Sequence, residues 1–232
     1  MRRTIRRFWV LPLALAVVYG ALLWPKTAAP VSVTLPEGPP VLIIDAGHGG
    51  EDGGAVSVSG QVESSINLSV ALRLDALMGF VGVTSVLLRD SDTSLHDADA
   101  STVAEKKKSD LQNRVAQVNA TENAVLISIH QNTYTDSGNH GAQVFYADEA
   151  GSFVLAQTAQ EALRLALDPA NARKPAKIPD SVYLMKHVTR PAILAECGFL
   201  SNPAEDKLLG TDAYQIKISL ALAAAYWDVY YR

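Results

Sequence analysis

The stretch Val41–Gly50, VLIIDAGHGG, decides the fold of this chain. The apolar residues at its start predict a buried β-strand, because strands that are covered on both faces carry continuous apolar runs. The acid, histidine and three glycines that follow predict a sharp turn out of that strand. We therefore expect the turn to hold His48 just beyond the strand, where it can serve as the first ligand of a metal site.

Strand-like and helix-like segments alternate through the rest of the chain. Helices are expected at 63–78, 111–118, 152–167, 203–208 and 216–231, with Gly79 ending the first and Ser109 or Asp110 capping the second. Strands are expected at 83–88, 124–129, 141–146 and 192–195. The polar segment 90–108 and the basic segment 168–190 are predicted to be long surface loops. This alternation predicts an α/β fold with a mainly parallel central sheet, flanked by helices on both faces.

The residues before Val41 differ in composition from the rest. Four arginines precede an apolar run over residues 8–24, a pattern typical of membrane targeting. Because no clear cleavage site ends the run, we interpret residues 1–25 as a retained signal anchor in preference to a cleaved signal peptide. Residues 26–40 hold four prolines and predict an extended tether. A single catalytic domain is then expected over residues 41–232.

Composition and charge narrow the class of protein. Hydrophobic residues make up 48% of the 232, enough to bury a sizeable core. The net charge is −4, and without the four arginines of residues 1–7 it is −8. A domain this acidic argues against nucleic acid as a partner. Cys197 is the only cysteine, so no intramolecular disulfide can form.

Ionisable residues stand at the ends of several predicted elements. His48 follows the first strand, His130 closes VLISIH, Glu196 closes PAILAE, and Glu63 opens the first helix. Carboxyl ends of parallel strands meet at one edge of a sheet, so these four residues are expected to lie close together. Two histidines and a carboxylate with an open position form a catalytic zinc set, and a second carboxylate can act as general base. The spacing alone does not decide which carboxylate has which role.

Five motifs, in this order, resemble a known family. They are IIDAGHGGEDGGA, ESSINL, RVAQVNA, LISIHQN and PAILAECGFLSN, and together they span Val41 to about Tyr230. In sequence they are similar to the zinc-dependent N-acetylmuramoyl-L-alanine amidases of the type-3 family. The short form with an N-terminal apolar segment is most similar to the CwlD-type amidases of spore cortex formation.

The resemblance implies a set of roles. Zn²⁺ would be held by His48, Glu63 and His130, and Glu196 would be the catalytic residue. The reaction would be hydrolysis of the amide bond between N-acetylmuramic acid and L-alanine in peptidoglycan, in cell-wall remodelling and spore cortex maturation. The expected partners are peptidoglycan, the membrane through the N-terminal segment, and an accessory protein. The protein would be exported, either anchored with its catalytic domain facing the cell wall or secreted if the segment is cleaved.

Two other functions stay open at this point. A zinc carboxypeptidase acting on peptide stems can share the ligand set and the α/β architecture. A non-catalytic peptidoglycan-binding module could retain a vestigial metal site. The reaction products distinguish these alternatives from an amidase. A carboxypeptidase would free a terminal amino acid, and a binding module would release no product.

Several residues near the motifs have alternative roles. Asp45 could hold a ligand histidine or cap the turn. Asn132 and the region of Asn202 could position substrate. We interpret Cys197 as a small buried hydrophobic residue and His140 as a surface residue.

Overall fold

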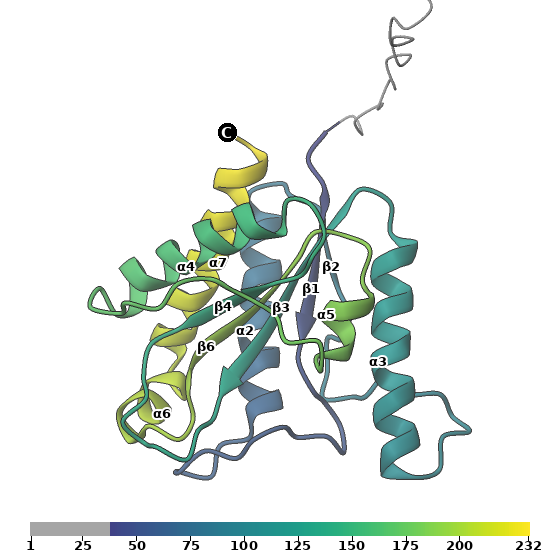
Figure 1. Ribbon diagram of the computed structural model, residues 1–232, viewed down its shortest axis with the longest axis horizontal. Helices are drawn as coiled ribbons and strands as arrows, with labels where there is room; N and C mark the ends of the chain where they lie inside the picture. The colour runs from purple at the N-terminus through teal and green to yellow at the C-terminus, as the bar shows by residue number, and fades with distance from the viewer. Residues whose placement is uncertain (1–37) are drawn as a thin grey trace, which may run out of the picture. The chain divides into compact units, whose positions relative to one another are not determined.

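A six-stranded sheet runs through residues 38–232, which are the residues that the computed structural model describes (Figure 1). Its strands are β1 (Val41–Ala46), β2 (Ser85–Leu87), β3 (Ala124–Asn132), β4 (Gln143–Tyr146), β5 (Ala176–Lys177) and β6 (Ala192–Phe199). The helices are α2 (Glu63–Phe80), α3 (Val103–Ala120), α4 (Ser152–Leu167), α5 (Tyr183–His187), α6 (Pro203–Leu209) and α7 (Asp212–Tyr230). The signal anchor and most of the tether predicted before Val41 lie outside the described residues.

The sheet has the order β2-β1-β3-β6-β4-β5 and is mainly parallel. β1 pairs in parallel with β2 and β3, and β3 pairs in parallel with β6. β4 runs antiparallel to β6 and parallel to β5. The parallel trio β1, β3 and β6 therefore brings three carboxyl ends to one edge, which confirms the predicted α/β architecture.

Helices cover both faces of the sheet (Figure 1). The larger core packs α2, α4 and α7 against strand residues such as Ile44, Ile127 and Ile193. The smaller core packs α3 and α5 against the other face, through residues such as Leu126 and Leu194. Because successive side chains of a strand point to opposite faces, one face of each central strand is left for the side of α3 and α5. His130 of β3 and Glu196 of β6 lie on that face.

Two segments that we predicted to be loops contain regular structure. α3 begins at Val103, because Thr102 and Glu105 form a capping box that satisfies backbone N–H groups at the helix start. The charged residues after it favour helix, so a cap at Ser109 or Asp110 was wrong. The segment 168–190 contains β5 and α5, whose apolar side chains Leu184 and Met185 are buried in the smaller core.

The end of the first helix also differs from the prediction. α2 passes through Gly79 to Phe80, and the following turn is made at Gly82, whose φ is +78°. Glycine is favoured at such a φ because it has no Cβ. Across residues 38–232, none of the helices is both long and apolar enough to cross a membrane.

Candidate metal centre and active site

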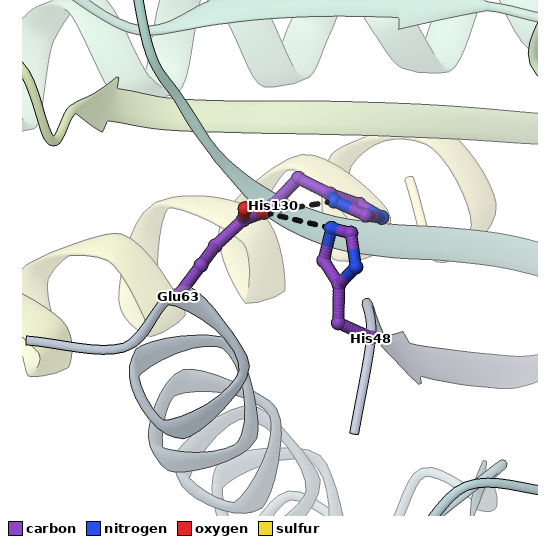
Figure 2. Close-up of side chains that lie close together, drawn as sticks. All are labelled: His48, Glu63 and His130. Carbon is purple, nitrogen blue, oxygen red and sulfur yellow. Dashed lines mark hydrogen bonds and ion pairs between the residues drawn. The ribbon is translucent and has the colours of Figure 1, made fainter. Parts of the chain in front are cut away.

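His48 lies two residues beyond β1, in a turn that adopts an uncommon backbone conformation. Its φ is +62°, in the left-handed region that few non-glycine residues occupy. Gly49 and Gly50 continue the turn with positive φ. The chain reverses here, with Gly49 pairing antiparallel to Asp52, and the imidazole of His48 points toward Glu63 and His130 (Figure 2).

The side chains of Glu63 and His130 meet His48 from two other elements (Figure 2). Glu63 is the first residue of α2, and its Oε1 lies 3.4 Å from His48 Nε2 and 3.0 Å from His130 Nδ1. One ligand atom from each residue lies within 4.8 Å of the other two. The rings of His48 and His130 stand edge to face, with centroids 5.0 Å apart. Three of the four residues singled out in the sequence thus form one compact cluster.

Glu196 stands beside this cluster on β6, in register with His130 on β3. Its Oε2 is buried and has no hydrogen-bond partner within residues 38–232. Glu196 borders a cavity of about 300 Å³ that also contacts His48 and His130 and is walled by residues of α3 and α5. An acceptor oxygen without a partner, next to two histidines and an open cavity, is suited to bind a water molecule or a reacting group.

Comparison with known proteins identifies the family. Residues 42–226 match the family Amidase_3, N-acetylmuramoyl-L-alanine amidase. The chain belongs to this family. It is therefore an enzyme that acts on peptidoglycan, at the amide bond between N-acetylmuramic acid and L-alanine, and the carboxypeptidase and binding-module interpretations are set aside.

Individual relatives support the assignment of this chain to the amidase family. It is 37% identical over 190 residues to the germination-specific N-acetylmuramoyl-L-alanine amidase of Bacillus subtilis, covering 82% of this chain and 79% of that protein. Its fold is similar to that of the CwlD amidase from Clostridioides difficile, solved in complex with the GerS lipoprotein, with a TM-score of 0.78, 36% identity and coverage of 82% and 98%. An N-acetylmuramoyl-L-alanine amidase from Clostridium difficile 630 gives a TM-score of 0.71 at 26% identity, with coverage of 82% and 96%.

The charges of the cluster favour an ionised Glu63. Burial opposes its ionisation, but hydrogen bonds and positive charge from His130 and His48 outweigh burial and hold the pKa of Glu63 well below its ordinary value. Glu63 Oε2 also accepts from the backbone N–H of Ala55 at 2.9 Å. The carboxylate is thus fixed in place in the form that binds a cation.

Asp52 is a residue of the site that our sequence analysis missed. Its Oδ2 lies 3.1 Å from His48 Nδ1, the ring nitrogen remote from Glu63. A carboxylate at this position orients an imidazole and leaves Nε2 free for a metal. In the sequence, Asp52 is marked only by its position four residues after His48. Without the geometry of the turn, this position does not distinguish Asp52 from its exposed neighbour Glu51.

The pKa of Glu196 leads to a prediction for the metal-free amidase. Burial, aided by the charge of Glu63, raises the pKa of Glu196 to about 7 from an ordinary value of 4.5, although both histidines oppose the shift. When folding raises the pKa of an acid, the protein loses stability as the pH rises from the pKa of the unfolded state to the pKa of the folded state. In metal-free protein, Glu196→Gln is therefore expected to raise the free energy of unfolding by roughly 2–3 kcal/mol more at pH 8 than at pH 5.

Urea unfolding with a chelator present, at both pH values, measures this effect. The exposed Glu122, changed to glutamine, is the control and should show no such difference. An equal gain at pH 5 and pH 8 would contradict a raised pKa at Glu196.

The remaining candidate residues are placed as follows. Asp45 is buried on β1, where it bonds to Arg114 and Ser128, so it neither caps the turn nor contacts a ligand histidine through a hydrogen bond. Cys197 is fully buried in the larger core, as predicted. His140 is on the surface and pairs with Asp168 at 3.0 Å. Asn202 caps α6 by accepting from the N–H groups of Ala204 and Glu205, which accounts for its side chain structurally.

Proposed function

We propose that the amidase holds Zn²⁺ with His48, Glu63 and His130 and uses Glu196 as general base and acid. The observation that supports this is the convergence of His48 Nε2, Glu63 Oε1 and His130 Nδ1 beside the unpartnered Oε2 of Glu196. Two imidazole nitrogens and one carboxylate make the donor set found in catalytic zinc sites with an open position. The residues present therefore fit the metal that the family resemblance implies.

Bound zinc would supply a Lewis acid that polarises the amide carbonyl and lowers the pKa of water. The protein side chains supply the rest of the chemistry. Glu196 accepts a proton from the attacking water while the water oxygen bonds to the carbonyl carbon of the amide. Glu196 then delivers that proton to the amide nitrogen as the C–N bond breaks. The buried Oε2 of Glu196 has no hydrogen-bond partner in the described part of the chain and borders the cavity, so this carboxylate is free to accept the proton and return it.

The cavity suggests how the substrate lies. It is bordered by Lys107 and Leu111 of α3 and by Tyr183 at the start of α5, and Glu196 and His130 also line it. A strand of peptidoglycan presents the scissile amide between a bulky sugar and a peptide. We propose that the substrate lies between α3 and α5, with its amide over Glu196.

We also propose where the enzyme acts. The apolar segment in residues 1–25 supports export and anchoring to the membrane, with the catalytic domain facing the wall. The similarity to a germination-specific amidase supports a role in the spore cortex. The similarity to an amidase solved with a lipoprotein supports an accessory protein as a partner.

The test uses the full chain, purified in detergent and incubated with peptidoglycan. Products are identified by mass, and zinc is measured in the same sample. We expect intact stem peptides that begin with L-alanine, one zinc per chain, and loss of both in Glu63→Ala but not in Glu122→Gln. Zinc retained in Glu63→Ala, or stem-peptide release by protein that holds no zinc, would overturn the proposed ligand set.

A further inference from the structure

We infer that Arg89 and Arg114 are positioning residues that hold His48 against Glu63 and thereby set the metal affinity of the site. This inference rests on the proposed ligand set. It concerns the backbone of Ala46, Gly47 and His48, the three residues that connect β1 to the first ligand.

Arg114 contacts this backbone from α3. Its side chain is only 2% exposed, and each of its five N–H groups has an acceptor. Nη1 donates to Ala46 O at 3.0 Å and Nη2 donates to His48 O at 2.8 Å. The other three donors go to the carboxylates of Asp45 and Asp110, which balance the buried charge. Arg114 thus binds the turn on one side and two fixed carboxylates on the other.

Arg89 contacts the same backbone from the segment after β2. It is 3% exposed, and its Nε donates to Ala46 O at 2.8 Å. Its Nη2 donates both to Gly47 O at 3.1 Å and to Ser64 O at 2.8 Å. Ser64 follows Glu63 directly, so a single guanidinium joins the turn that carries His48 to the start of the helix that carries Glu63.

The turn needs such external support. His48 adopts a left-handed backbone conformation that a non-glycine residue occupies only when its surroundings stabilise it. All three carbonyls of the turn point to the guanidinium groups, and Gly47 O also accepts from Asn67 Nδ2 at 3.2 Å. A planar guanidinium reaches two elements at once, whereas a lysine ammonium at the end of a flexible chain cannot reproduce that geometry.

The experiment compares the full-length wild type with Arg89→Lys and, separately, Arg114→Lys. Zinc affinity is measured by competition with a chelator, the Co²⁺ absorption spectrum reports ligand geometry, and thermal melting of metal-free protein reports folding. We expect zinc affinity to fall by about 10–100-fold in each variant, with an altered Co²⁺ spectrum. Arg73→Lys is the matched control, because Arg73 is a partly buried arginine of α2 whose partners are Ser69 and Asp212. Its zinc affinity should equal that of the wild type.

A merely structural role would lower the melting temperature without changing zinc affinity or the Co²⁺ spectrum, and that result would overturn the inference. If one variant fails to fold, the other still decides, since both arginines hold the same turn. If the wild type itself binds no zinc, the proposed ligand set is wrong, and the inference falls with it. If the wild type binds zinc and a folded variant binds it equally tightly, the inference about the arginines is wrong while the proposed ligand set stands.

Discussion

Changing Glu196 to glutamine is expected to lower kcat by about 10²–10⁴-fold. Glutamine keeps the size and polarity of the side chain but cannot take a proton from water or return it to the leaving amine. Zinc affinity should stay close to that of the wild type, because the three proposed ligands are His48, Glu63 and His130. The measurement is the rate of stem-peptide release from peptidoglycan, with zinc content determined on the same preparation.

The separation of activity from metal content makes this test specific. Glu63→Gln is expected to lose zinc and activity together, because it removes a ligand whose charge binds the cation. Glu122→Gln, an exposed change, should retain both. If Glu196→Gln kept wild-type turnover with zinc bound, Glu196 would not be the base. If it lost zinc, Glu196 would be a ligand and the two carboxylates would have been assigned the wrong way round.

Gly47→Ala is the second change for which we expect a large effect. A Cβ built on Gly47 would lie 2.2 Å from His130 Cε1 and Nε2, far inside van der Waals contact. The imidazole would have to leave its place against Gly47, and its Nδ1 would then move away from Glu63. Because displacement of a reacting group by about 1 Å can lower the rate by about 10²-fold, we expect at least that loss of activity, together with weaker zinc binding.

Gly79→Ala provides the control for this prediction. Gly79 lies within α2, and a Cβ there meets nothing within 4 Å in the described part of the chain. Alanine also favours helix over glycine, so this variant should be as active as the wild type and at least as stable. Zinc titration and peptide release are measured on both variants. Wild-type zinc affinity in Gly47→Ala would show that the site tolerates movement of His130 and that its packing against Gly47 is unimportant.

Much of the fold could be predicted because it depends on local patterns. The apolar runs at Val41 and Ala124 become β1 and β3, and the spacing in residues 152–167 becomes α4 over the same residues. The start of α3 could not be placed by apolar periodicity, because its first turn is polar and is set by a capping box. α5 is stabilised by burial of Leu184 and Met185 against the sheet, and its five residues are too few to show a helical pattern in the sequence.

The sequence by itself determined which residues could form the site. His48, His130 and Glu196 follow strand-like runs, and Glu63 opens a helix, so the parallel sheet brings them to one edge. Only the tertiary structure decided how they are held there. Asp52 reaches His48 through the turn, Arg89 joins that turn to α2, and Gly47 leaves room for the ring of His130. Some of these contacts join residues that are far apart in the chain, and others depend on backbone angles. Residue type and spacing alone predict neither the long-range contacts nor the angles.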